Sequence, residues 1–192
     1  MTKVSLIHDV QSCTICEIDL PYGARPVFQV HPKAKILIAG QAPGRRVHET
    51  GIPFHDPSGD RLREWMGIDK ETFYNAEKVA ILPMGFCYPG TGKSGDLPPR
   101  KECAAAWRER LLAYIPDIQL TLLIGEYAQK WHLGEAYKGQ VTATVQACQE
   151  YAPQYIPLPH PSPRNNIWLK KNLWFERETL PVLKKRVHQS LV

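Results

Sequence analysis

The sequence predicts an α/β fold in which a central four-stranded parallel sheet lies between two layers of helices, a three-layer α/β/α sandwich. Segments with strand composition alternate with helical segments along the chain, and the strand segments are continuous apolar runs. Such runs are typical of parallel strands that helices cover on both faces. The chain has 192 residues, of which 43% are hydrophobic, which is enough for one well-buried core. We therefore expect one domain that comprises residues 1–192.

The strands are predicted from short runs of aliphatic residues that end at Gly or Pro, because these residues interrupt a strand. They are expected at Ala34–Ala39, Val79–Pro83, Gln119–Ile124 and Tyr155–Leu158. Helices are expected between the strands, at Asp60–Met66, Lys101–Tyr114 and Glu126–Leu133. The chain closes with a helical region, Asn165–His188, which we expect to be interrupted at Pro181 or before it.

Two short loops follow predicted strands that are far apart in the sequence. The first loop is Gly40-Gln41-Ala42-Pro43-Gly44, and the second loop is His160-Pro161-Ser162-Pro163-Arg164-Asn165. If both strands are parallel members of one sheet, the two loops meet at its carboxyl edge, where open α/β folds bind ligands. The sequence therefore predicts a functional site at this edge.

The charge and hydropathy of the chain bound the classes of partner. A net charge of +5 is compatible with a polyanionic partner without requiring one. No run approaches the length of a membrane span, and Met1–Asp9 has neither the apolar stretch nor the cleavage site of a signal peptide. We expect a cytoplasmic protein with no membrane partner.

The cysteines are interpreted for a reducing compartment, where clustered thiols favour metal or redox roles over disulfides. Cys13 and Cys16 form a C-x-x-C pair, and Cys87 and Cys103 bracket fifteen residues. Cys148 is isolated in the sequence, and we interpret it as a buried core residue. A Cys₄ zinc site normally has two tight C-x-x-C pairs, whereas the second pair here is widely spaced. The spacing therefore favours an iron–sulfur cluster over zinc.

The Gly- and Pro-rich segment between Cys87 and Arg100 contains Gly90-Thr91-Gly92-Lys93-Ser94, which resembles the end of a phosphate-binding P-loop. A P-loop needs a glycine five residues before the second glycine, and Cys87 stands there. The residues that follow, Gly95–Pro99, cannot form the helix whose N-terminus would receive a phosphate. We interpret this segment as a basic, flexible loop.

Three groups of residues agree in order and spacing with one known family. The first group comprises Gly40-Gln41-Ala42-Pro43-Gly44, Thr50-Gly51-Ile52-Pro53-Phe54 and Ser58-Gly59-Asp60-Arg61-Leu62. The second group is His160-Pro161-Ser162-Pro163. The third group is the four spaced cysteines, including Cys87-Tyr88-Pro89-Gly90. On these residues the chain resembles the uracil-DNA glycosylase superfamily, and within it most closely the iron–sulfur branch. The resemblance covers most of the chain.

The resemblance implies a DNA repair enzyme that hydrolyses the N-glycosidic bond of a deaminated or damaged base, foremost uracil, after the base is flipped out of DNA. Its partner would be DNA that contains such a base, and we expect it to act as a monomer. The resemblance also implies a structural [4Fe–4S] cluster bound by Cys13, Cys16, Cys87 and Cys103, with no metal in the reaction itself.

The same resemblance assigns roles in the cleavage step. His160 would donate a hydrogen bond to the leaving base, which becomes negatively charged as the bond breaks. Phe54 would stack against the base. The backbone amides of Gln41 and Ala42 would recognise the carbonyl oxygens of the base, and Gly40 is expected to take part in binding the substrate.

The second loop is expected to contact the DNA backbone. Arg164 stands where relatives place a side chain that wedges into the minor groove, and an arginine there also reaches phosphate. Ser162 and Asn165 are expected to hold flanking phosphates. Basic residues nearer the C-terminus either extend this footprint or form a solvated helix face; they are Lys170, Lys171, Lys184, Lys185 and Arg186.

Two departures from the family pattern affect the expected chemistry. Some relatives carry, at the position of Ala42, an aspartate that positions the attacking water, and relatives often carry, near Pro83, an asparagine that reads the pyrimidine edge. We expect Glu49 or backbone groups to hold the water instead. His48, in the charged segment Arg45-Arg46-Val47-His48-Glu49, is a second candidate acid, base or nucleophile.

These departures also leave an alternative open. A module that binds DNA lesions or nucleobases, and that has lost turnover, would keep the cleft, the second loop and the cluster. Ala42 in place of the aspartate and Pro83 in place of the asparagine are the substitutions expected in a protein that has lost turnover.

Overall fold

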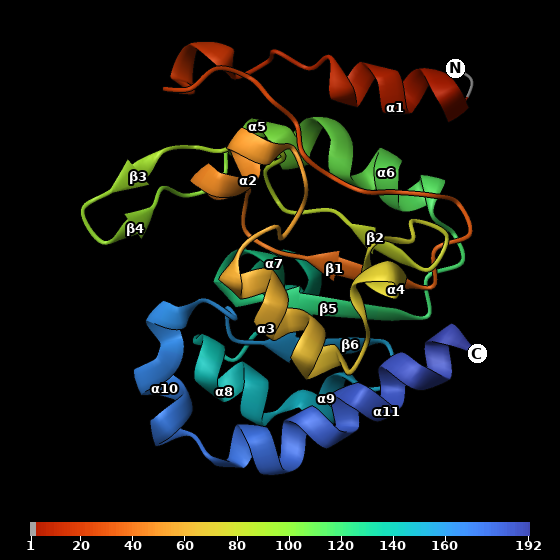
Figure 1. Ribbon diagram of the computed structural model, residues 1–192, viewed down its shortest axis with the longest axis vertical. Coiled ribbons are helices and arrows are strands. Elements are labelled where there is room, and N and C mark those ends of the chain that lie inside the picture. Colours follow the sequence, from red (N-terminus) through yellow and green to blue (C-terminus); the bar gives the residue numbers. More distant parts are fainter. Residues whose placement is uncertain (1–2) are drawn as a thin grey trace.

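The computed structural model describes residues 3–192 and shows a parallel sheet between two layers of helices (Figure 1). Within these residues the sheet has four strands, β1 (Ile36–Ala39), β2 (Val79–Ile81), β5 (Leu120–Ile124) and β6 (Tyr155–Leu158), in the order β2-β1-β5-β6. All neighbouring strands are parallel. The predicted fold class and the predicted strands are thus confirmed, with ends that differ by at most two residues.

One face of the sheet carries Ile36 and Ile38 and packs against apolar side chains of four helices. These helices are α3 (Pro57–Met66), α4 (Lys70–Tyr74), α8 (Val141–Gln146) and α11 (Leu180–Leu191). Leu37 and Ala39 point to the other face, because successive residues of a strand alternate. That face is covered by α1 (Lys3–Gln11), by the helix over residues 101–114 and by α7 (Gly125–Leu133).

The shorter elements connect these layers. They are η1 (Glu17–Asp19), α2 (Arg45–Thr50), η3 (Gly134–Ala136), α9 (Cys148–Tyr151), η4 (Pro163–Asn165) and α10 (Asn166–Lys171). The buried Cys148 lies on α9. In the part of the chain that the structure describes, no helix is long and apolar enough to cross a membrane.

The helix over residues 101–114 contains a π-helical turn. It consists of α5 (Lys101–Cys103), the π turn η2 (Ala104–Arg108) and α6 (Glu109–Tyr114). Its limits agree with the predicted helix. Turns of this kind are frequent at functional sites, and here the turn begins directly after Cys103 and ends at Arg108.

The C-terminal helical region is interrupted at residues 172–174, which precede Pro181 as expected. The side chain of Asn172 occupies the break: its Nδ2 donates to the carbonyl of Trp168 (2.8 Å), and its Oδ1 accepts from the indole of Trp174 (3.1 Å). After the break, a second π turn, η5 (Phe175–Thr179), leads into α11. Pro181 lies in the first turn of α11, where its missing N–H costs no helical hydrogen bond.

The segment that was expected to be an irregular loop contains a hairpin. Strands β3 (Thr91–Gly92) and β4 (Gly95–Asp96) pair in antiparallel fashion, and Leu97 N donates to the carbonyl of Gly90 at 2.8 Å. The hairpin projects from the body of the protein on the same side as α2 (Figure 1). It therefore stands near the carboxyl edge of the sheet.

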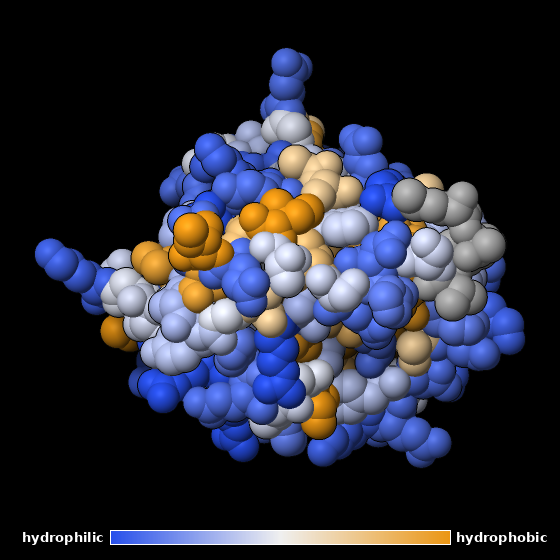
Figure 2. All heavy atoms as spheres, turned by 90° about the horizontal axis from the view of Figure 1, so that it is seen from above, coloured by the Kyte–Doolittle hydropathy of each residue, from blue (hydrophilic) through white to orange (hydrophobic). Residues whose placement is uncertain are grey.

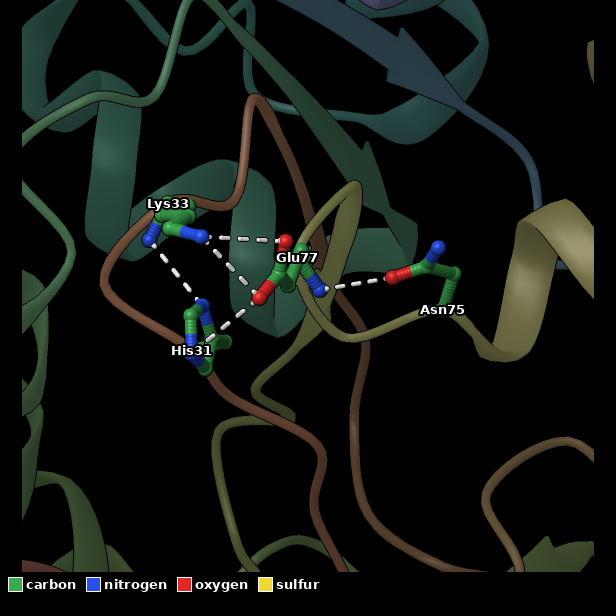
Figure 3. Close-up of polar contacts among 4 residues, drawn as sticks. All are labelled: His31, Lys33, Asn75 and Glu77. Carbon is green, nitrogen blue, oxygen red and sulfur yellow. Dashed lines mark hydrogen bonds and ion pairs between the residues drawn. The ribbon is translucent and has the colours of Figure 1, made fainter.

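Charged side chains join the two chain segments that enter β1 and β2, at the opposite edge of the sheet (Figure 3). Glu77 accepts from Lys33 at 3.2 and 3.3 Å and lies 3.8 Å from the ring of His31, and its backbone N–H donates to Asn75 Oδ1 at 3.0 Å. These groups are solvent-exposed, so we assign each ion pair only about 0–1 kcal/mol.

A cleft at the carboxyl edge of the sheet

A cleft of about 630 Å³ lies where the parallel strands end. Its walls come from the first loop, the start of α3, the β3–β4 hairpin and the second loop. The sequence-predicted residues that it brings together are Gly40, Gln41, Ala42, Phe54, His160, Ser162, Arg164 and Asn165, and Pro83 also lines it. The two loops thus meet at the carboxyl edge, as the strand pattern predicted.

Phe54 is held beside the first loop by a strained backbone. Its φ of 53° is the positive value that a non-glycine residue rarely adopts, and among the described non-glycine residues it is the one such case. Helix α3 begins so close by that a Cβ on Gly59 would lie 1.8 Å from the Phe54 carbonyl oxygen. The ring packs edge-on against Phe73 (centroids 6.1 Å apart) and lies near Gly40, where a Cβ would be 3.8 Å from Cζ. A Cβ at residue 40 would therefore be in van der Waals contact with the end of the ring.

His160 presents one ring nitrogen to the second loop. Its Nδ1 accepts the backbone N–H of Ser162 at 3.1 Å, so in the neutral ring the proton is on Nε2. Burial lowers the pKa of His160, and the carboxylates of Asp56 and Asp96 oppose this shift while Arg164 adds to it. A lowered pKa leaves the imidazole neutral at pH 7, with Nε2–H as its donor.

The second loop is fixed by bonds that use part of its polar groups. Asn165 Nδ2 donates to the carbonyl of His160 (2.7 Å), and Ser162 Oγ accepts the N–H of Arg164 (3.2 Å). From α3, Arg61 donates to the Ser162 carbonyl (3.1 Å) and to Asn166 Oδ1 (2.8 Å). Arg61 belongs to the first motif group, but the sequence did not indicate that its side chain bonds to the second loop.

The side chain of Gln41 points to the hairpin. The side-chain Nε2 donates to the carbonyl of Leu97 at 3.0 Å, while the backbone carbonyl of Gln41 accepts from Gly85 N at 3.0 Å. The amide side chain is thus a tie between the first loop and the hairpin.

Arg164 reaches across the mouth of the cleft to the same hairpin. A Cβ on Gly95 would lie only 2.8 Å from Arg164 Nη1, and the φ of Gly95 is +142°, which also favours glycine. The arginine side chain is exposed at this position. The second loop and the hairpin therefore touch at the rim.

Glu49 does not line the cleft. It lies on α2, where its carboxylate pairs with Arg45 at 3.0 Å and its carbonyl accepts from Arg25 at 3.0 Å. His48 lies outside the lining too, with its ring 6.1 Å from that of Tyr22 and 6.0 Å from that of Tyr88. Burial, followed by the charge of Arg25, lowers the pKa of His48.

Two carboxylates that no motif indicated do line the cleft. Asp56 caps α3 by accepting the N–H of Gly59 at 2.9 Å, and Asp96 lies on the hairpin. A pattern of S/T/D/N before a helix marks Asp56 as a cap, but no local pattern places Asp96 beside the first loop.

A buried arginine supports the cleft from behind. Arg108 is 1% exposed and donates to the carbonyls of Leu82 (3.0 Å) and Pro83 (3.1 Å) and to the ring Nε2 of His132 (2.7 Å). Burial lowers the pKa of Arg108 to about 10, and burial together with this arginine lowers the pKa of His132 to about 3. Arg108 thus fixes the backbone of Pro83, which lines the cleft, and it was not indicated by the sequence.

The four cysteines expected to act together line a second, small cavity. They are Cys13, Cys16, Cys87 and Cys103. The indole N–H of Trp107 donates to Cys13 Sγ (3.2 Å), and the backbone N–H of Phe86 donates to Cys103 Sγ (3.3 Å).

Burial raises the pKa of Cys87 to about 11 and that of Cys103 to about 12. Within residues 3–192, no three His, Cys, Asp or Glu side chains are grouped closely enough to hold a single metal ion. The N-terminal segment that carries Cys13 and Cys16 is exposed, because Ile15 is 57% and Ile18 is 96% exposed. Figure 2 views the protein from this side and shows hydrophobic side chains among hydrophilic ones.

Comparison with known proteins places most of the chain in one group. The family model of the Uracil DNA glycosylase superfamily matches residues 27–184, a range that includes Cys87 and Cys103 and begins after Cys13 and Cys16. Among solved structures, the chain is similar to the solution NMR structure of a "putative Uracil DNA glycosylase" from Methanosarcina acetivorans. The two share 14% identity with a TM-score of 0.49, over 84% of this chain and 98% of the other.

Proposed function

Because the chain belongs to the uracil DNA glycosylase superfamily, we propose that it releases a deaminated or damaged base, foremost uracil, from DNA by hydrolysis of the N-glycosidic bond. The observation that carries this proposal is the arrangement of His160 and Phe54 in one cleft, with a ring N–H donor and an aromatic face supplied by the two motif groups. A base must leave the duplex to enter such a cleft.

The geometry suggests how the cleft would act on the leaving base. Phe54 offers its face for stacking, and Gly40 leaves the space beside it open. As the bond breaks, negative charge develops on the base, and the Nε2–H of His160 would stabilise it by a directed hydrogen bond. A neutral imidazole held by Ser162 keeps this donor in place without a proton transfer.

The charges around the cleft are suited to a nucleotide whose phosphates stay at the rim. Arg46 and Arg164 line the cleft, and cations at its mouth would attract the DNA backbone. Asp56 and Asp96 place negative charge among the same lining residues, and this would favour positive charge on the sugar.

We also propose that Cys13, Cys16, Cys87 and Cys103 hold a [4Fe–4S] cluster. All four line one cavity, and two N–H groups point at their sulfur atoms, as is common for cysteine ligands of clusters. When bound, the cluster would link the N-terminal segment covalently to the segments that carry Cys87 and Cys103. Because these cysteines lie outside the cleft lining, we propose that the cluster would act in the scaffold rather than in the reaction.

The alternative function is binding without turnover. It is favoured by one observation, that Ala42 carries no acid and Glu49 does not line the cleft. A module of this kind would bind lesion-containing DNA and release no base.

The two functions are separated by measuring base release beside binding. Single-turnover reactions on oligonucleotides that contain uracil, hypoxanthine or xanthine, in single strands and duplexes, would be followed by alkaline cleavage of the abasic product. Anisotropy would give the affinity for the same oligonucleotides and for undamaged DNA. We expect release of at least one base, with uracil fastest. Tight binding to lesions with no release from any substrate would replace the enzyme by the binding module.

A further inference from the structure

The acid that the first loop lacks is available from a different part of the chain. We propose that Asp96, carried into the cleft by the β3–β4 hairpin, is the carboxylate that orients the attacking water and accepts its proton during base release. This inference rests on the glycosylase function proposed above, and it assigns a catalytic residue to a segment outside the motif groups.

The position of the carboxylate carries the inference. Asp96 lines the cleft together with Ala42 and His160. Its Oδ2 lies beside the first loop, because a Cβ built on Gly44 would be 3.5 Å from it. Gly44 is two residues after Ala42, so the hairpin delivers a carboxylate next to the loop whose own acid is replaced by alanine. The negative charge of Asp96 also acts on the His160 ring, which agrees with both groups facing the same space.

The hairpin holds this carboxylate in a defined place. Asp96 pairs with Thr91 across the two strands, and Thr91 Oγ1 donates to Asp96 Oδ1 at 3.4 Å. The Thr91 hydroxyl is also hydrogen-bonded to the hydroxyl of Tyr88, a fully buried residue. At the base of the hairpin, Gln41 bonds to the Leu97 carbonyl, so the first loop and the hairpin are joined directly.

The other carboxylates near the cleft have different tasks. Asp56 is committed to the N-terminus of α3, where it accepts the Gly59 N–H and helps to set the close approach that positions Phe54. Glu49 does not line the cleft, and its carboxylate pairs with Arg45. Asp96 is therefore the lining carboxylate whose bonds, within the described residues, serve only the hairpin itself.

The reaction balances with these groups. The bond between the sugar C1′ and the base nitrogen breaks, and its electron pair stays on the base, where the Nε2–H of His160 stabilises the charge. The water oxygen forms a bond to C1′, and the water gives one proton to the Asp96 carboxylate. The free base then takes up a proton from solvent, and Asp96 returns its own. The net change is the addition of one water molecule across the glycosidic bond.

The test compares Asp96→Asn with matched variants in single-turnover release of uracil and in binding to the same oligonucleotide. Loss of a general base should slow release by about 10²-fold or more, while affinity for the DNA is unchanged or slightly higher because a negative charge is removed. Thr91→Val removes the hydroxyl that holds the carboxylate but keeps the carboxylate itself, so it should slow release less than Asp96→Asn does. Lys93→Gln is the control for the hairpin, since Lys93 is exposed and does not line the cleft; we expect its rate to stay within about threefold of the original.

A second variant tests the role by replacement. If Asp96 supplies the acid that Ala42 lacks, the substitution Ala42→Asp should restore part of the rate in the Asp96→Asn background and add little to the unsubstituted protein. The inference is overturned if Asp96→Asn changes the rate by less than about threefold while the unsubstituted protein is active, or if Lys93→Gln is as slow as Asp96→Asn. An unsubstituted protein that releases no base would instead overturn the proposed function, and this assignment with it.

Discussion

The cleft and the cysteine cavity share the chain between β2 and α6, yet they are built in different ways. The cleft is wide, and its lining comes from loops that follow parallel strands, with Pro83 at the end of β2. The cysteine cavity is small and lies beyond the sheet, where Cys87 and Cys103 face the N-terminal pair. The packed sheet positions the cleft residues, because they follow the ends of its strands. The cysteine cavity is lined by three segments outside the sheet, which carry the Cys13–Cys16 pair, Cys87 and Cys103. The proposed chemistry and the proposed cross-link by a cluster thus lie in different parts of one stretch of sequence.

The largest effect should come from the cleft. Replacing His160 by alanine should slow base release by roughly 10²–10³-fold, because one directed hydrogen bond to the developing negative charge is lost. Single-turnover rates on uracil-containing single strands and duplexes would measure this. Thermal unfolding should change little, since the loop is held by Arg61 as well. An unchanged rate, together with a collapse when His48 or Glu49 is replaced, would move the chemistry to α2.

Substitutions in the cysteine cavity should have the opposite effect: they should lower the stability of the protein rather than act on base release directly. We expect protein purified without oxygen to be brown, with about four iron and four sulfide per chain. Cys87→Ala should remove the colour and lower the melting temperature, while Cys148→Ala, at a buried cysteine away from the cavity, should keep the colour. Colourless protein with stoichiometric zinc would contradict the cluster and leave the fold intact.

Phe54 should show an intermediate effect on capture of the base. Phe54→Ala removes the stacking face and should weaken binding of the flipped base by about 1–3 kcal/mol. The comparison is with Phe54→Tyr, which keeps the ring. Affinity for uracil-containing DNA, measured against undamaged DNA, isolates the stacking contribution. An equal loss on both DNAs would assign Phe54 to packing instead.

The support behind the cleft should have the smallest effect at neutral pH and should appear only in acid. The folded-state pKa of His132 is lowered to about 3, below its ordinary value near 6.5, so the unfolded chain binds more protons between these values. Stability is therefore complete above about pH 6.5 and falls as the pH drops toward 3, by at most about 1.4 kcal/mol per pH unit for this proton. Denaturant titrations at several pH values would show it, and His132→Gln, which keeps an acceptor for Arg108, should flatten the dependence. A variant with the same pH dependence would assign it to other groups.

The sequence predicted those parts that depend on local pattern. Aliphatic runs ended by Gly or Pro located the strands, and the parallel order then implied that the first and second loops meet. The hairpin was missed, because strands of two residues have no detectable alternation. Asp96 and Arg108 were missed since their roles arise from contacts between distant segments. Glu49 was expected near the water, but a helical turn places it beside Arg45, out of the cleft.

The π turn that follows Cys103 and ends at Arg108 limits how this chain can change in length. Cys103 faces the cysteine cavity and Arg108 faces the carbonyls of Leu82 and Pro83, and both depend on the extra residue in the turn. In an ordinary α-helix each residue advances about 100° around the axis. Deleting one residue to restore regular geometry would therefore preserve the helix and turn one of these side chains away from its partners. Substitutions in this segment should be tolerated more readily than insertions or deletions, although most of it lies at the surface of the fold.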